Sequence, residues 1–331
     1  MKRLLRRLRR FAAPKLRPGP VILMYHRIAS PPVDPWGLCV SPANLRSQAR
    51  ALRSKRTPLG MDAFVEGLQS GDLPANAVAL TFDDGYIDNL VEAKQILEEE
   101  GVPATVLITS GWIGADRLFW WDELARLILL SRDEADLTLK IEDSDFVIRL
   151  PRALADDIRP GWRAWEPANS PREKAYFDLW TRLQRLDGEA RDAIIATLAD
   201  MIDAPPIPPG DLAMTAKDLK RLPSPMMTVG AHAITHQPLT SMSAEAQRRE
   251  MGESRRVCSE ITECSITGFA YPHGDADAQT RRIAREAGFT WACSTHSSAV
   301  SRNNYDLFDL PRIVAPNVAG SALLGHMRAQ S

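Results

Sequence analysis

From residue 20 onward, short apolar runs alternate with longer amphipathic stretches, and this alternation constrains the fold of the 331-residue chain more than any other feature. Such a pattern is typical of parallel strands buried between helices. It predicts strands at 20–27, 77–83, 104–109, 226–232, 268–271, 290–294 and 310–314, and helices at 41–54, 87–100, 244–263 and 278–287. The repeated strand–helix unit therefore predicts an α/β protein, either a barrel or an open parallel sheet.

The ends of several predicted helices carry recognisable signals. Ser41 and Ser243 stand where an N-cap side chain would accept a hydrogen bond from the first turn. Gly101 and Gly288 follow the last turns of two other helices, where glycine adopts the left-handed backbone that ends a helix. These signals support the assigned boundaries.

Charge and cysteine content exclude several classes of protein. The net charge of −1 offers no broad electropositive surface, so we expect no nucleic-acid partner. The four cysteines form no CxxC pair and no dense disulfide pattern, in a chain long enough to build an ordinary core. We expect them to be reduced thiols that mostly fill the core rather than zinc ligands.

The first residues, MKRLLRRLRRFAAPKLRPGP, are strongly basic. They lack the apolar run of roughly 7–15 residues that a secretory signal requires, so we expect a cytoplasmic protein. Leu4, Leu5, Leu8 and Phe11 recur at helical spacing among lysines and arginines, as in helices that lie on anionic bilayers. Both a peripheral membrane contact through residues 1–17 and a frayed basic tail remain open.

Adjacent carboxylates follow the predicted strand at 77–83, where α/β folds gather their active sites. In ALTFDDGY, Asp83 and Asp84 precede a glycine that permits a sharp turn. Two carboxylates on such a turn can point in different directions, so that one binds a cation while the other accepts a proton. A solvated Asp-Asp-Gly turn is the alternative interpretation.

Three histidines also stand at or near predicted strand ends. His232 and His236, in VGAHAITHQPL, are four residues apart, which on one helical turn places both imidazoles on the same face. Together with one carboxylate they could form an open site for zinc, iron or cobalt. His26, in VILMYHRI, is either structural or a proton donor to a leaving group, because its ordinary pKa lies near neutrality.

The segment GFAYPHGD is the fourth candidate element. Tyr271, Pro272, His273 and Gly274 form a strand exit with a rigid turn. Its backbone amides could stabilise an oxyanion next to the lining side chains, although a plain turn is equally compatible with the sequence.

Taken together, TFDDG and the spaced histidines resemble the polysaccharide deacetylase family, whose members share the NodB-homology domain and include chitooligosaccharide deacetylases. The resemblance covers residues 20 to about 316. It implies an irregular (β/α) barrel, with a basic segment at 1–19, a catalytic domain at 20–331 and a helical insertion at about 118–210. The insertion contains helical patterns at 173–186 and 190–202.

The resemblance also implies roles for individual residues. Asp83 would be the general base, and Asp84, His232 and His236 would hold a divalent metal, zinc first, with cobalt, nickel, iron or manganese as alternatives. The MYH segment precedes TFDDG, as in one subgroup of the family, and this implies that His26 is the acid.

Two departures from the family pattern are visible. Ala233 stands where Ser or Thr is usual, which removes a supporting hydrogen bond but no ligand. The arginine expected near Tyr271 is absent, and Arg312, in LPRI at the end of the last predicted strand, is the candidate that would orient the base.

The implied substrate is an amino-sugar oligo- or polysaccharide, or its lipid-linked precursor, from which N-acetyl groups are removed. Two alternatives remain: a carbohydrate-binding protein of the same fold without turnover, and an O-acetyl esterase or amidase. Tryptophans of the insertion could fill its core or stack on sugar rings: Trp120, Trp121, Trp162, Trp165 and Trp180.

Deleting residues 1–17 tests the membrane interpretation of the N-terminus. If these residues form a basic amphipathic helix, the deletion should abolish binding to anionic vesicles in a sedimentation assay. Unchanged binding would contradict this interpretation.

Overall fold

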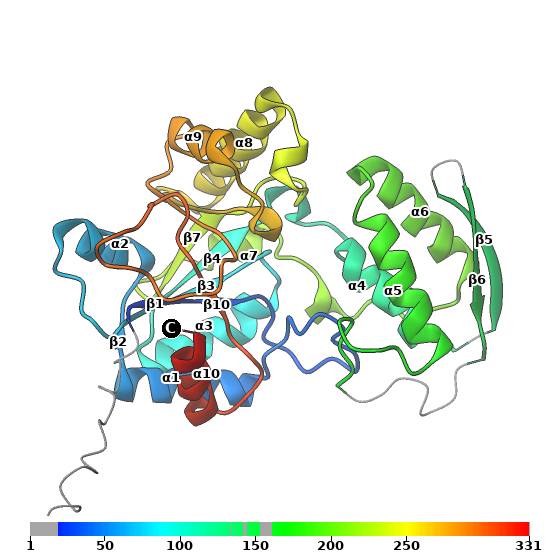
Figure 1. The fold of residues 1–331 in the computed structure, drawn as a ribbon, viewed down its shortest axis with the longest axis horizontal. Coiled ribbons are helices and arrows are strands. Elements are labelled where there is room, and N and C mark those ends of the chain that lie inside the picture. The colour runs from blue at the N-terminus through cyan, green and yellow to red at the C-terminus, as the bar shows by residue number, and fades with distance from the viewer. Residues whose placement is uncertain (1–18, 133, 142–143, 153–160, 331) are drawn as a thin grey trace, which may run out of the picture.

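The computed structural model describes residues 19–132, 134–141, 144–152 and 161–330 of the chain. They form a barrel and a smaller lobe that lie side by side (Figure 1). The basic segment proposed as a membrane contact lies outside the described residues. Among the described residues, no helix is both long and apolar enough to cross a membrane.

One eight-stranded sheet forms the barrel, and all its strand pairings are parallel. Its first three long strands are buried along their whole length, which explains why they appear in the sequence as continuous apolar runs. In spatial order the strands are β10 (Ile313–Val314), β1 (Val21–Tyr25), β3 (Ala77–Phe82), β4 (Ala104–Ile108), β7 (Met227–Ala231), β8 (Gly268–Ala270) and β9 (Trp291–Cys293), with β2 (Thr57–Pro58) beside β3.

The segment that leads into β10 joins the two ends of this sheet. Leu310 pairs with Cys293 of β9, and Ile313 pairs with Leu23 of β1. The sheet is therefore curled into an irregular barrel, as the family resemblance implies, and the carboxyl ends of its strands meet on one side.

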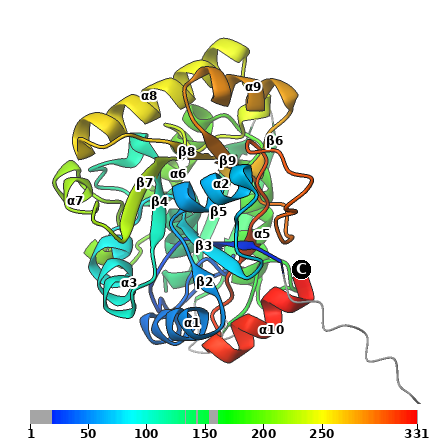
Figure 2. The ribbon, with the colours of Figure 1, turned by 90° about the vertical axis from the view of Figure 1, so that its left-hand side faces the viewer.

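Helices surround the sheet, as the view in Figure 2 shows. The predicted caps are confirmed: Ser41 Oγ accepts from the Asn44 amide, and Ser243 Oγ accepts from the Ala246 amide. The helices are α1 (Pro42–Lys55), α2 (Met61–Ser70), α3 (Lys94–Glu100), α7 (Ala216–Lys220), α8 (Ala244–Thr262), α9 (Ala278–Glu286) and α10 (Gly320–Gln330). The predicted helix at 87–100 begins as a π-helical turn at Asn89–Ala93. Neither α2 nor α10 was expected from the sequence.

The smaller lobe corresponds to the region predicted as a helical insertion, but it is not wholly helical. It contains α4 (Trp120–Ala125) with a π-helical continuation (Arg126–Leu130), α5 (Pro171–Leu183) and α6 (Gly188–Met201), together with an antiparallel pair, β5 (Ala135–Ile141) and β6 (Ser144–Leu150). In β5 the residues Leu137, Leu139 and Ile141 are buried and their neighbours are exposed or half-buried. This period of two is the strand signal that the long helical patterns beside it obscured.

Each part has its own hydrophobic cluster. The barrel core is mainly aliphatic, whereas the lobe core contains Trp120, Trp121 and Trp162, all less than 8% exposed. These three tryptophans fill a core, as one of the two interpretations predicts. All four cysteines are free, and three of them are buried, as expected. Short 3-10 turns complete the chain: Ser110–Trp112, Pro209–Asp211, Leu239–Ser241 and Pro272–Gly274.

Gly268 in β8 offers a test of the barrel packing. A Cβ at this position would overlap the ring of Trp291, which Asp62 holds in place through a 2.9 Å hydrogen bond from the indole nitrogen. Gly268→Ala should therefore lower the free energy of unfolding by about 1–3 kcal/mol in urea denaturation, the usual cost of overpacking a core.

The matched control is Gly252→Ala in α8, where a Cβ would meet nothing within 4 Å. This substitution should stabilise the protein by about 0.5–1 kcal/mol, because alanine is the better helix former. Equal stability of the two variants would contradict the described packing.

Candidate metal centre

Three predicted metal ligands meet at the carboxyl ends of the barrel strands. Asp84 follows β3, and His232 and His236 follow β7. The Oδ1 atom of Asp84 lies 3.2 Å from Nε2 of His236 and 3.6 Å from Nε2 of His232, and all three side chains are buried. Their ligand atoms lie within 4.8 Å of one another. Two imidazoles and one carboxylate at such distances can hold one divalent cation.

Hydrogen bonding around the three ligands fits a cation. Nδ1 of His232 lies 2.8 Å from the carbonyl oxygen of Ala270, which can only accept, so Nδ1 carries the proton and Nε2 presents a lone pair to Asp84. Oδ1 of Asp84 is buried and has no hydrogen-bond partner among the described residues. An unpaired carboxylate oxygen facing an imidazole lone pair is unfavourable unless a positive charge lies between them.

The prediction that His232 and His236 share one helical turn is wrong. Residues 232–236 form a loop in which Ala233 and His236 have positive φ angles of 62° and 57°. This loop nevertheless brings the two rings to a centroid distance of 4.9 Å. A spacing of four residues is compatible with a helix, but here the backbone of a loop brings the two imidazoles together.

A buried glutamate of α8, not expected from the sequence, holds this loop. Oε2 of Glu250 accepts from the backbone amides of Ile234 and Thr235 at 2.7 and 2.9 Å, and Oε1 accepts from the Thr235 hydroxyl. The carbonyl of Ala233 also accepts from the Ser110 amide. Glu250 therefore supports the loop in which alanine stands in place of the usual Ser or Thr.

Backbone strain is concentrated at this centre. Five non-glycine residues of the described chain have positive φ, and four of them belong to the centre, namely the candidate ligands Asp84 and His236 together with Ala233 and His273. The fifth, Glu263, ends α8. Left-handed backbone costs an L-residue roughly 1–2 kcal/mol, and such residues persist where the surrounding structure fixes a functional geometry.

Asp83, the neighbour of Asp84, is held by an arginine from the other end of the chain. Nη1 and Nη2 of Arg312 donate to Oδ1 and Oδ2 of Asp83 at 2.6 and 2.8 Å. Arg312 is completely buried and also donates to the Ser294 carbonyl and the Thr81 hydroxyl. The arginine proposed from the sequence thus reaches the carboxylate proposed as the base.

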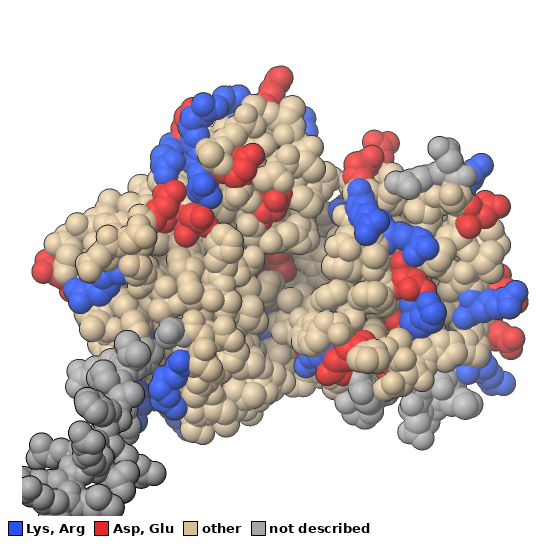
Figure 3. Space-filling model, in the orientation of Figure 1, with Lys and Arg blue, Asp and Glu red and all other residues tan. Residues whose placement is uncertain are grey.

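His26 and the predicted turn lie around one cavity of about 240 Å³ that also contains the ligands. His26, Asp83, Tyr271 and His273 line it, whereas Pro272 is buried and does not. The backbone carbonyl of His26 accepts from the Asn89 side chain at 2.8 Å. The surface is hollowed between the barrel and the lobe (Figure 3). Every proposed side chain therefore lies around this cavity except those of Pro272 and Arg312, and Arg312 reaches it only by its hydrogen bonds to Asp83.

Comparison with known proteins gives the family. A family model described as polysaccharide deacetylase matches residues 70–135 and 195–292. The chain belongs to the polysaccharide deacetylase family. The matched segments contain Asp83, Asp84, His232 and His236, and the described residues between the two segments lie in the smaller lobe. His26 and Arg312 lie outside the matched segments.

Among curated relatives, this deacetylase-family chain is similar to YxkH of Bacillus subtilis (strain 168), a protein named as a polysaccharide deacetylase. The two are 26% identical over 110 residues, which are 33% of this chain and 39% of YxkH. The alignment thus spans about two fifths of the relative.

Solved structures share the fold at low identity. The Streptococcus pyogenes deacetylase PplD, solved with acetate, has a TM-score of 0.60 and 19% identity, covering 93% of this chain and 98% of PplD. IcaB from Ammonifex degensii has a TM-score of 0.55 and 16% identity, covering 95% and 97%.

Burial shapes the charges of this deacetylase-family centre. It lowers the pKa of His232 to about 4 and those of His236 and His273 to about 3, so the imidazoles are neutral near pH 7. Burial likewise raises the pKa of Asp84. Burial alone would raise the pKa of Asp83 too, but the attraction of Arg312 outweighs it and holds that pKa well below its ordinary value.

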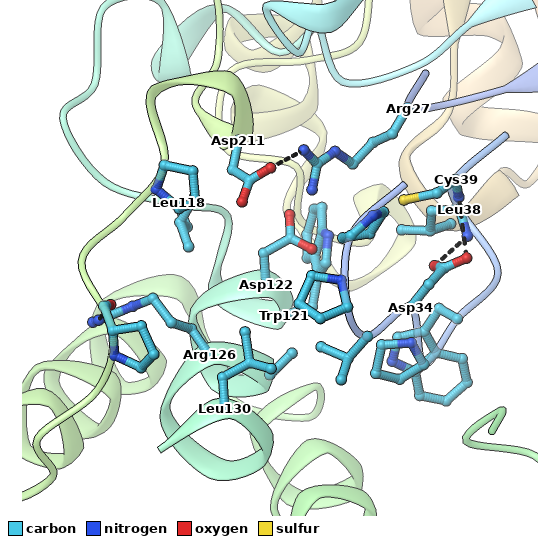
Figure 4. A pocket seen from close by; sticks show the side chains of 18 of the residues that line it. Arg27, Asp34, Leu38, Cys39, Leu118, Trp121, Asp122, Arg126, Leu130 and Asp211 are labelled. Carbon is cyan, nitrogen blue, oxygen red and sulfur yellow. Dashed lines mark hydrogen bonds and ion pairs between the residues drawn. The ribbon is translucent and has the colours of Figure 1, made fainter. Parts of the chain in front are cut away.

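A polar network supports the cavity wall from behind. The Tyr86 hydroxyl donates to Asp122 at 2.6 Å and accepts from the Trp121 indole at 3.1 Å, while the Trp121 ring lies 4.8 Å from that of His236. Asp122 and Trp121 line a second cavity of about 380 Å³, where Arg27 pairs with Asp211 (Figure 4). Trp36, Leu38 and Trp121 line both cavities.

Arg312→Ala tests the buried ion pair. The substitution leaves Asp83 buried without its partner, so the free energy of unfolding should fall by about 3–5 kcal/mol in chemical denaturation at neutral pH. As a control, Arg256→Ala removes an exposed arginine paired with Glu253 and Glu260 and should leave stability nearly unchanged. An Arg312→Ala protein as stable as the wild type would refute the pairing.

Proposed function

We propose that this chain is a metal-dependent deacetylase that removes N-acetyl groups from an amino-sugar oligo- or polysaccharide, or from its lipid-linked precursor. The observation that carries this proposal is one cavity in which Asp84, His232 and His236 lie beside a second carboxylate held by Arg312. Family membership supports the reaction class, and YxkH and PplD are both named as deacetylases.

A divalent metal held by Asp84, His232 and His236, zinc first among the candidates, would lower the pKa of a water molecule and polarise the acetyl carbonyl. Asp83 is assigned as the general base that accepts the proton of the attacking water. Arg312 keeps Asp83 ionised and fixes its orientation, at some cost in basicity, since it lowers the pKa of that carboxyl.

His26 is assigned as the acid that donates a proton to the departing amine nitrogen. It lines the cavity together with Asp83, and Asn89 fixes its backbone. The backbone amide of His273, on the turn beside Tyr271, is proposed to donate to the oxyanion that forms as the carbonyl is attacked. The position of His26 ahead of TFDDG places the chain, in this proposal, in the subgroup with an N-terminal MYH segment.

The domain assignment is part of the proposal. Residues 20–331 would form one catalytic domain into which about 118–210 are inserted, and the unmatched stretch 136–194 supports this division. Residues 1–19 would add a peripheral contact with the inner membrane face, where a lipid-linked substrate is accessible.

The experiment is acetate release from N-acetylglucosamine oligomers by metal-stripped protein, with and without added zinc or cobalt. Activity should require the metal. Asp83→Asn and His26→Ala should each lower turnover by ~10²–10⁴-fold, because each removes a proton-transfer group. His326→Ala is the matched control, since His326 lies on α10 and does not line the cavity.

Two outcomes would contradict the assignment. Wild-type turnover in folded Asp83→Asn or His26→Ala protein would remove the assigned role of that residue. Release of acetate from O-acetylated but not from N-acetylated oligomers would make the protein an esterase, and release from neither despite bound metal would favour a carbohydrate-binding protein.

A further inference from the structure

Four tryptophans form a row from the candidate centre to the protein surface. The ring centroids of Trp120 and Trp180 are 5.9 Å apart, those of Trp180 and Trp36 are 4.1 Å apart, and those of Trp36 and Trp165 are 6.4 Å apart. Trp120 is 3% exposed, Trp180 and Trp36 are half-buried, and Trp165 is 63% exposed. We call these four residues the tryptophan row.

The row is continuous with the cavity that holds the proposed chemistry. Trp120, Trp180 and Trp36 line the same 240 Å³ cavity as His26, Asp83 and the metal ligands. Trp36 comes from the barrel loop after β1, whereas the other three come from the smaller lobe. The row therefore begins beside the reacting groups and leaves the cavity across the junction of the two parts.

The exposed end of the row is held in place. The Ala164 amide donates to the Pro35 carbonyl at 2.8 Å, and Nη1 of Arg163 donates to the Asp34 carbonyl at 2.7 Å. Gly37, with a φ of 66°, leaves room for the Trp165 ring, because a Cβ there would lie 3.3 Å from that ring. These contacts hold Arg163 and Ala164, the two residues before Trp165, against the loop that carries Trp36.

The inner rings are fixed as well. The indole nitrogen of Trp36 donates to the Tyr176 hydroxyl of α5 at 2.9 Å. The Trp165 ring is 63% exposed, so its burial contributes little to the stability of the fold. The hydrogen bonds of the residues before it nevertheless hold the ring next to Trp36. A large apolar surface held rigidly at the mouth of a cavity is the kind of surface that anchors a ligand.

We propose that the tryptophan row is a platform for an oligosaccharide chain, so that sugar rings beyond the acetylated one contact Trp36, Trp180 and Trp165. This proposal rests on the proposed function. Pyranose rings present apolar C–H faces, which pack on indole rings, and an extended sugar chain can follow a row of them. The neighbouring Arg163 pairs with Asp34, so its charge is already matched and does not favour an anionic partner.

The test measures how binding and turnover depend on the length of N-acetylglucosamine oligomers. For the metal-loaded wild-type chain, kcat/KM should rise with length, and calorimetry on chelator-treated protein should show affinity rising in parallel. Trp165→Ala should lower the affinity for long oligomers by about tenfold, which is the usual loss when an anchoring tryptophan is truncated. The affinity for the shortest substrate should not change.

Three matched variants sharpen the result. Trp165→Tyr should retain most of the affinity, because it keeps an aromatic ring. Arg163→Ala should lower affinity for long oligomers by freeing the ring without removing it. Tyr305→Ala removes another exposed aromatic ring that is outside the row and should change nothing.

The outcomes separate this inference from the proposed function. Acetate release that is independent of length and unaffected by Trp165→Ala would overturn the platform while leaving the deacetylase intact. The opposite result is a protein that releases no acetate but binds longer oligomers more tightly, with this length dependence lost in Trp165→Ala. That result would support the platform and contradict the proposed deacetylase activity.

Discussion

The centre depends on how two adjacent buried carboxylates are neutralised. Asp83 and Asp84 directly follow the same strand, β3, and both are only 2% exposed. Arg312 neutralises Asp83 through two hydrogen bonds, and it can do so because the segment before β10 closes the barrel next to β1 and β3. Asp84 has no such arginine and faces two neutral imidazoles instead, so a divalent cation is the charge that this arrangement lacks.

The smaller lobe contributes aromatic side chains to the wall of the cavity that contains the candidate metal centre. The barrel alone supplies the proposed ligands, the proposed base and Arg312, while the lobe supplies most of the aromatic wall: Trp120, Trp121 and Trp180. Trp121 is fixed through Tyr86 and Asp122, a carboxyl whose pKa burial raises to about 7. The proposed chemistry and the proposed substrate contacts thus come from two parts of the chain that each have their own core.

The sequence predicted most of the barrel because strands buried on both faces appear as uninterrupted apolar runs. It singled out the proposed ligands because they follow such strands, and Arg312 because it stands at the end of the last predicted strand, although in the structure Arg312 directly precedes β10. It missed the β5–β6 pair, whose alternation lies among helical patterns, and it assigned His232 and His236 to a helical turn because the positive φ angles there leave no signal in residue type. Glu250 and the tryptophan row become visible only when distant segments are brought together.

A cobalt titration of metal-free protein, followed by calorimetry and visible absorption, tests the central claim most directly. The account predicts one equivalent of Co²⁺ bound, an absorption spectrum characteristic of nitrogen and oxygen ligands, and a rise in the unfolding temperature on binding. Asp84→Ala and His236→Ala should lose all three, whereas Asp83→Asn should retain them. Absence of binding to the wild-type chain, or binding that survives both ligand substitutions, would contradict the account.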